Sequence, residues 1–363
     1  MIAGVIASFA NWRWVFGATG GLAILVTAAG IFCIPPPPLN TVSREKATFA
    51  SQLKTVDWIG GFLVTAGLLA LMFALTQGNV VGWNSAPWIY MLIVIALLLL
   101  AIFGAWQWYQ ERHMTRAPLM KVSMFKNLRF TAALLIMGIF FGYFNDFLVF
   151  ATFFWQDYQG LSALQTTFRF IPTGATGVIV AFAVSHLVSR LPTWALLLFG
   201  NLAATISCLL FSIPIPPDTS YLAYGLLAMI LSVIGADISW PCLTLFTSKS
   251  LPQEDQAMGG ALINAMGQFG RAIGLAITTA IQTAVMASHR GLPVQESGGI
   301  VAWEPASLAG LRAGNWFNFG LGVSCMVLVF VSFRGTGIVG KIEKPVRLGG
   351  EDGIVNDETP RRS

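Results

Sequence analysis

Nine long apolar stretches dominate this sequence, and they constrain its fold more than any other feature. Each holds about 20 mostly apolar residues, the length that an α-helix needs to cross the hydrocarbon core of a bilayer. The stretches are residues 14–34, 58–77, 88–108, 130–155, 168–188, 194–213, 221–245, 259–286 and 316–333. They are too long for barrel strands and lack the alternation of a strand. We therefore predict an all-α polytopic membrane protein with about nine transmembrane helices.

The composition excludes a soluble protein of this length. Apolar residues make up 55% of the chain and charged residues only 10%, where a soluble chain carries about 25% charged residues. The four cysteines lie inside apolar runs and lack the spacing of metal ligands, so we expect neither disulfides nor a metal site. The tail, residues 334–363, is polar and charged, and we expect it to be disordered.

The basic residues give the spans a direction. If the connection after the first span is on the inside, sixteen Lys and Arg residues lie in inside segments and three in outside segments. This split predicts a cytoplasmic C-terminal tail, and it explains the net charge of +5 without any nucleic acid. An odd number of spans also places the N-terminus outside. Either a short tail is translocated or the chain has lost preceding spans, and we favour the second interpretation.

Four groups of motifs resemble the fourteen-span drug:proton antiporter branch of the major facilitator superfamily, and most closely its fungal multidrug and aminotriazole-resistance exporters. They are Asn11-Trp12-Arg13-Trp14-Val15-Phe16, Asp57-Trp58-Ile59-Gly60-Gly61, the segment from Gly235 to Ala257 with Gly235-Ala236-Asp237-Ile238-Ser239-Trp240-Pro241, and residues 264–276. The resemblance implies a partial major facilitator fold in which the nine spans match family helices six to fourteen. It also implies that an N-terminal helical bundle, about five helices, is missing.

Asp146 is the first of five ionisable residues that fall within spans, where a charge is costly and marks a candidate functional position. At 1.5 Å per residue it lies about 24 Å into its span, beside Asn145. One interpretation is a carboxyl that carries protons or faces the substrate. The other is a carboxyl that is hydrogen-bonded between helices, and the sequence leaves both open.

Asp237 and Arg271 lie on adjacent antiparallel spans, and their side chains lean toward one another in depth. They either form an ion pair or have separate partners. Asn264 and Gln268 share one helix face and could line a cavity with Arg271. For Arg169 we favour a side chain that reaches the outer surface, although a role in lining a cavity stays open. For His186 we favour a side chain at the membrane interface whose hydrogen-bonding groups are satisfied, over a proton relay.

Other residues are expected to shape the helices. Gly270 and Gly274 form a small-xxx-small pair that permits close helix packing, and Gly260 and Gly267 extend the same thin side. Two prolines, Pro172 and Pro241, are expected to kink their spans by removing backbone hydrogen bonds.

These patterns predict a transporter, not an enzyme. We expect export of small amphipathic compounds, such as a drug, toxin or secondary metabolite, with a proton gradient as the driving force and no cofactor. The phosphate-binding motif of ATP-driven pumps is absent from the sequence. The expected partners are the bilayer, the substrate and the missing N-terminal bundle, and the plasma membrane is favoured over the vacuole. The alternative is a truncated or accessory membrane protein without transport activity of its own.

Overall fold

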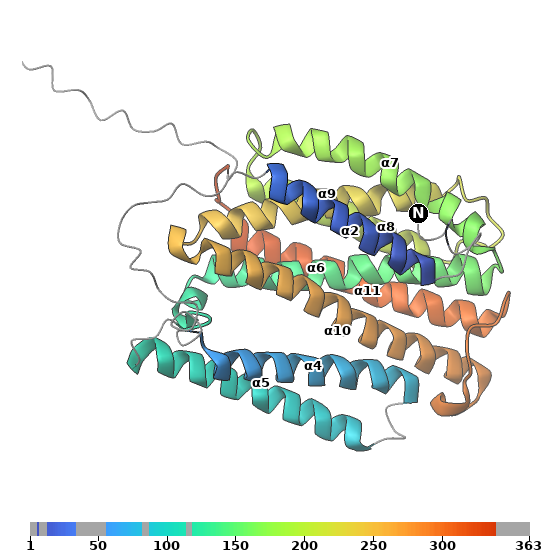
Figure 1. Ribbon diagram of the computed structural model, residues 1–363. Coiled ribbons are helices and arrows are strands. Elements are labelled where there is room, and N and C mark those ends of the chain that lie inside the picture. The colour runs from blue at the N-terminus through green and yellow to red at the C-terminus, as the bar shows by residue number, and fades with distance from the viewer. Residues whose placement is uncertain (1–5, 7–12, 34–55, 82–86, 114–117, 339–363) are drawn as a thin grey trace, which may run out of the picture.

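The computed structural model describes residues 6, 13–33, 56–81, 87–113 and 118–338 (Figure 1). Within these ranges it has no strand, and nine helices are long and apolar enough to cross a membrane. They are α2 (Arg13–Cys33), α4 (Trp58–Val81), α5 (Pro87–His113), α6 (Leu128–Phe153), α7 (Ala163–Leu187), α8 (Thr193–Ser212), α9 (Gly225–Lys249), α10 (Gln256–Arg290) and α11 (Pro305–Phe333). This finding confirms the prediction of an all-α membrane protein with about nine spans.

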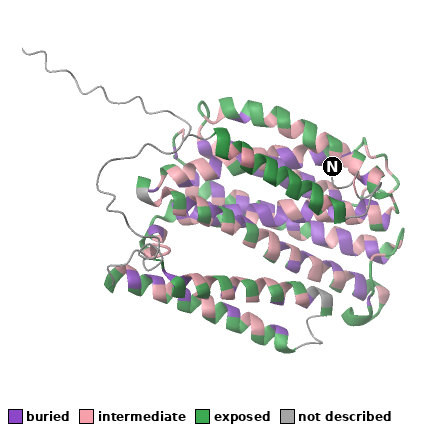
Figure 2. Cartoon of the chain, viewed as in Figure 1, coloured by how far each residue is buried: buried purple, intermediate pink, exposed green. Residues whose placement is uncertain are grey.

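Helices α6 to α11 form a packed bundle, and the buried residues concentrate in its middle (Figure 2). Helix α6 runs through this core and packs against α10 and α11, while α8 packs against α9 and α11. Four large aromatic side chains of α6 are fully buried: Phe130, Phe140, Phe147 and Phe150. Helix α7 packs mainly on α9, and most of its residues stay at least partly exposed, as expected for a helix at the bundle's edge.

Helices α4 and α5 form an antiparallel hairpin beside the bundle, and α4 contacts α10 (Figure 1). Most of the hairpin's large apolar side chains are exposed, which suits contact with lipid. No described residue of α2 is buried.

Asp57 anchors the start of the hairpin. Its Oδ1 accepts hydrogen bonds from the Gly60 amide at 2.9 Å and the Trp106 indole at 3.1 Å, and its Oδ2 accepts one from Gln107 Nε2 at 2.6 Å. The first bond caps α4, and the other two join α4 to α5. Burial raises the pKa of this carboxyl, but these hydrogen bonds outweigh burial and hold the pKa below its ordinary value.

The segment between α5 and α6 connects the hairpin to the bundle. The Met120 amide donates to Gln107 Oε1 at 3.0 Å. The next residue, Lys121, forms a salt bridge with Asp255 at the start of α10, with 2.9 Å between Nζ and Oδ1. This network lies at the end of the bundle that the charge pattern assigns to the cytoplasm.

The last helix begins at Pro305 rather than at Trp316, where we predicted the last span to start. The earlier segment contains Arg312, which the hydropathy criterion treats as a loop residue. In the structure the Arg312 side chain donates to the Ile215 carbonyl at 2.6 Å, so the helix continues through it. Helix α6 is likewise extended, by a π-helical turn over Phe154–Tyr158. The predicted disordered tail lies mostly outside the described residues, from residue 339 onward.

A seam of glycines joins α6 to α10. A Cβ atom on Gly270 would overlap the carbonyl group of Gly138, and one on Gly274 would lie 2.9 Å from Gly142 Cα. The two backbones therefore touch through Gly138 and Gly142 on one helix and Gly270 and Gly274 on the other. The sequence pointed to the pair on α10 but not to its partner pair on α6.

The other expected helix-shaping residues behave differently from one another. Gly267 makes ordinary contact with Phe141, and Gly260 has open space beside it, so neither brings backbones together as closely as Gly270 does. Pro172 and Pro241 both lie inside helices, and α7 and α9 continue through them.

Candidate functional site

A pocket of about 510 Å³ lies between α7 and α9, in the half of the bundle nearer the predicted cytoplasmic end. Helix α9 contributes Asp237, Trp240 and Pro241 to its lining, and α7 contributes small and aliphatic side chains with Ser185. Asp237 is the only ionisable residue in this lining. The volume lies within the range typical of small-molecule sites.

The carboxylate of Asp237 has no hydrogen-bond or ion-pair partner among the described residues. It lies against the backbone of α7, because a Cβ atom on Gly177 would be 3.1 Å from its Oδ2. The one hydroxyl on the lining, that of Ser185, donates to the Phe182 carbonyl instead. Asp237 is partly exposed, so a molecule entering the pocket can reach it.

Arg271 lies close to this pocket but is not paired with Asp237. Its guanidinium carbon sits 4.7 Å from the centre of the Phe141 ring, and Trp240 packs edge-on against the same ring at 5.3 Å. Neither interpretation therefore holds in full: Arg271 has a separate partner in its cation–π contact with Phe141, and Asp237 has none among the described residues. The Nε atom of Arg271 is buried without a hydrogen-bond partner.

Asn264 and Gln268 are both exposed on α10, on the helix face that the sequence assigned to them. The Asn264 amide donates to the Gly260 carbonyl of its own helix at 2.8 Å. They do not line the pocket between α7 and α9. Two exposed amides in the first half of a spanning helix favour contact with water or with further polar groups over contact with lipid.

Asp146 is fully buried where α6, α10 and α11 meet, slightly farther from the predicted cytoplasmic end than the middle of its span. The Thr278 hydroxyl lies 2.8 Å from Asp146 Oδ2 and 3.2 Å from Asn318 Oδ1. A hydroxyl carries one proton, so it can donate to only one of these oxygens at a time. Asp146 Oδ1 and Asn318 Nδ2 are buried without a partner. We call Asp146, Thr278 and Asn318 the buried polar triad.

Asn145 does not belong to this triad. It is partly buried, and its side chain makes no hydrogen bond to any other described residue. His186, which the sequence left as an interfacial side chain, is exposed and lies 3.0 Å from both the Phe182 carbonyl and the Ser185 hydroxyl.

The arginines at the end opposite the predicted cytoplasmic end are held by internal partners, which the sequence did not predict. Arg169 donates to Gln159 Oε1 at 2.7 Å, and its guanidinium lies over the rings of Trp155 and Tyr221. Tyr221 also donates to the Arg169 carbonyl at 2.8 Å. These contacts hold this end of α7 on the bundle, and the expectation that Arg169 reaches the outer surface stays a prediction.

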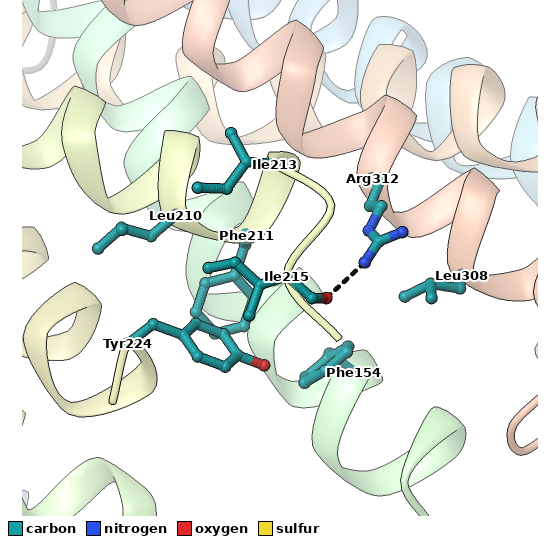
Figure 3. A pocket seen from close by; sticks show the side chains of 8 residues that line it. All are labelled: Phe154, Leu210, Phe211, Ile213, Ile215, Tyr224, Leu308 and Arg312. Carbon is teal, nitrogen blue, oxygen red and sulfur yellow. Dashed lines mark hydrogen bonds between the residues drawn. The ribbon is translucent and has the colours of Figure 1, made fainter. Parts of the chain in front are cut away.

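Arg312 borders a water-sized hollow of about 10 Å³, lined by Phe211, Tyr224 and other apolar side chains (Figure 3). Its guanidinium points toward the Ile215 carbonyl on the α8–α9 connection. Arg290 binds Glu304, Ser307 and the carbonyls of Ser297 and Gly299 in the connection between α10 and α11. Both outer arginines therefore organise connections at the ends of the bundle.

No group of His, Cys, Asp and Glu residues in the described ranges is arranged to hold a metal ion.

Comparison with known proteins identifies relatives that carry transporter names. The model of the Major Facilitator Superfamily matches residues 59–275. MFS-type transporter 1 of Pyricularia oryzae is 25% identical, over 94% of this chain and 62% of its own length.

Two further relatives carry more specific names. The low affinity ammonium transporter of Saccharomyces cerevisiae is 27% identical over 77% of this chain and 52% of its own length. The efflux pump terG of Aspergillus terreus is 24% identical over 91% of this chain and 59% of its own length. The chain thus spans less than two thirds of the length of each of these relatives.

Proposed function

Because the chain belongs to the Major Facilitator Superfamily, whose model matches more than half of it, we propose that it takes part in proton-coupled export of small amphipathic compounds. Nine candidate membrane spans and relatives with transporter names support a transporter in preference to an enzyme. Export, proton coupling and the class of substrate are our proposal. The relatives' names support export in one case and ammonium transport in another.

The pocket between α7 and α9 is the observation that carries this proposal. It combines a volume of about 510 Å³, a mostly apolar lining and one unpaired carboxylate, Asp237. Small-molecule sites are typically concave and apolar, with a few polar groups that fix orientation. An amphipathic compound fits this chemistry better than an inorganic ion, which would need several polar ligands in place of an apolar wall.

We propose that the buried polar triad carries the proton. As a carboxylate, Asp146 and its neighbour Asn318 offer three acceptor oxygens to the single proton of Thr278. A protonated Asp146 supplies a second donor, so proton binding would improve the hydrogen bonding at the junction of α6, α10 and α11. A group that alters helix contacts when it gains a proton is suited to coupling.

We further propose a place for the exposed polar face of α10. Asn264, Gln268 and the nearby Arg271 would lie against water or against a second helical bundle, as in the fourteen-span drug:proton antiporter branch that the motifs resemble. The distribution of basic residues supports a cytoplasmic C-terminal tail, and the proposed location is the plasma membrane in preference to the vacuole.

The same face supports a second candidate function. Polar side chains exposed on a spanning helix call for a partner, and without one this chain would act as an accessory membrane protein that does not transport by itself. The two candidates differ in what the isolated chain can do.

Reconstitution into vesicles tests the proposal. With an acidic interior, we expect the chain to drive accumulation of an amphipathic dye, and an ionophore that collapses the proton gradient should stop it. Dye uptake that continues at the same rate after the ionophore is added would contradict proton coupling. A complete lack of uptake by correctly inserted protein would favour the accessory role.

A further inference from the structure

We propose that the pocket between α7 and α9 is a binding site for organic cations, with Asp237 as the countercharge and Trp240 as an aromatic wall. This inference rests on the proposed transport function and specifies the charge of its substrate. The pocket, its lining and the partners of each polar group carry it.

The charge of the site comes from Asp237 alone. A carboxylate within a spanning helix is costly unless it has a partner, and the described residues supply none. Arg271 is not among the lining residues, and its guanidinium stacks on Phe141. An entering cation would therefore supply the missing countercharge.

The shape of the site also suits a cation with an apolar body. Trp240 is 37% exposed and lines the pocket, and its ring is held in place by the edge-on contact with Phe141. Tryptophan is the strongest aromatic partner for a cation. Apart from Ser185, the remaining lining is aliphatic, from Ala181, Val184, Val188 and Leu245 with Pro241, and would cover the apolar part of the ligand.

Gly177 sets how closely the carboxylate lies against α7. A Cβ atom there would be 3.1 Å from Asp237 Oδ2 and 3.5 Å from Val233. A larger residue at this position would push the carboxylate away from its place along α7. The position of the charge thus depends on Gly177. This glycine has an ordinary φ angle, and it matters because its missing side chain leaves room for the carboxylate.

Two probes of the same shape and opposite charge test the inference. The full 363-residue chain in lipid nanodiscs is titrated with tetraphenylphosphonium and with tetraphenylborate, and binding to empty nanodiscs is subtracted. We expect the wild-type chain to bind the cation at least tenfold more tightly than the anion. Equal affinity, or a preference for the anion, would overturn the inference.

Variants then locate the charge. Asp237→Asn should weaken binding of the cation at least tenfold, and Asp237→Glu should restore most of it because the charge returns. Asp218→Asn removes a carboxylate from an exposed outer turn and should leave the affinity unchanged. If Asp237→Asn binds the cation as the wild type does, the site lies elsewhere.

These results can be separated from a failure of the proposed function. Cation binding that depends on Asp237 in a chain that moves no dye across vesicles would leave the site in place and overturn the transport role. Transport of uncharged dyes by a chain without cation preference would keep the transport role and overturn this inference.

Discussion

Asp57 shows how a single side chain can fix a helical hairpin in a membrane protein. Its carboxylate joins the first turn of α4 to Trp106 and Gln107 on α5, and Gly60 leaves the room that this contact needs. A Cβ atom on Gly60 would overlap both Asp57 Oδ2 and Gln107 Nε2, whereas one on Gly61 would meet nothing within 4 Å.

Gly60→Ala should therefore destabilise the hairpin and Gly61→Ala should not. Because the new methyl group displaces a buried, hydrogen-bonded carboxylate, we expect a loss of about 1–3 kcal/mol. Thermal unfolding of the detergent-solubilised protein would measure the difference. Equal melting temperatures for the two variants would show that the Asp57 network does not hold the hairpin.

Thr278 is the only donor that the structure gives to Asp146. Thr278→Val keeps the shape of the side chain but leaves the buried carboxyl without a hydrogen bond, so we expect a loss of about 1–3 kcal/mol. Thr283→Val on the same helix is the matched control, because the Thr283 hydroxyl bonds only to the Thr279 carbonyl. Chemical unfolding would compare the two. A larger effect in the control would contradict the role of the buried polar triad.

Glu304 gives a pH dependence that can be worked out from its partners. Hydrogen bonds from Arg290 and Ser307 lower its pKa from 4.5 to about 2. Because the pKa is depressed in the folded chain, the contact is fully stabilising above pH 4.5 and is lost as the pH falls toward about 2.

A spin label on Gly299→Cys, in a background without other cysteines, would report on the connection between α10 and α11. Arg290 holds this connection through the Gly299 carbonyl, and a side chain at this position has open space. We expect the label to become more mobile between pH 4.5 and 2. In Glu304→Gln the mobility should vary little over this range. An identical pH response in both proteins would contradict the account.

At the scale of elements, the contact between α6 and α10 depends on paired glycines. Gly270→Ala should separate the two helices, because its methyl group would overlap the Gly138 carbonyl, while Gly260→Ala on the same helix meets open space. Overpacking of this kind typically costs about 1–3 kcal/mol. Thermal unfolding of both variants would test this prediction. If Gly270→Ala melts at the same temperature as Gly260→Ala, the two helices can separate at the seam without a loss of stability.

The spans could be predicted from sequence because the bilayer fixes their length and composition. Eight of the nine predicted stretches cover more than three quarters of a helix, whereas the ninth covers 18 of the 29 residues of α11, because α11 begins at Pro305 in a segment that the sequence analysis assigned to a loop. A hydropathy criterion counts Arg312 as unfavourable in a span, because it contains no information on the Ile215 carbonyl that accepts a hydrogen bond from the guanidinium. Helix extent depends on such partners as well as on hydropathy.

The candidate site could be predicted only in part, for the same reason. The sequence identified Asp146, Asp237 and Arg271 because charges within spans are rare. It could not identify the partners, since Thr278 lies 132 residues from Asp146 and Phe141 is an ordinary apolar residue of α6. The pocket between α7 and α9 arises from helix packing, which leaves no pattern in the sequence.

For the whole molecule, the structure separates two carboxylates with different surroundings. Asp237 lies midway along α9, on an open pocket that extends toward the predicted cytoplasmic end, and Asp146 is enclosed where α6, α10 and α11 meet. If the first binds substrate and the second binds the proton, the two need not compete for one site. Their coupling would then pass through α6 and α10, since α9 contacts both helices and their glycine seam lies beside Asp146.

Asp146→Asn tests this account most directly, because an amide mimics the protonated carboxyl and cannot release a proton. When the variant is reconstituted into vesicle membranes, we predict that an imposed proton gradient no longer drives accumulation of an amphipathic dye. Exchange of labelled for unlabelled dye, which needs no net proton movement, should persist. Gradient-driven accumulation at the wild-type rate would contradict the central claim that Asp146 couples transport to protons.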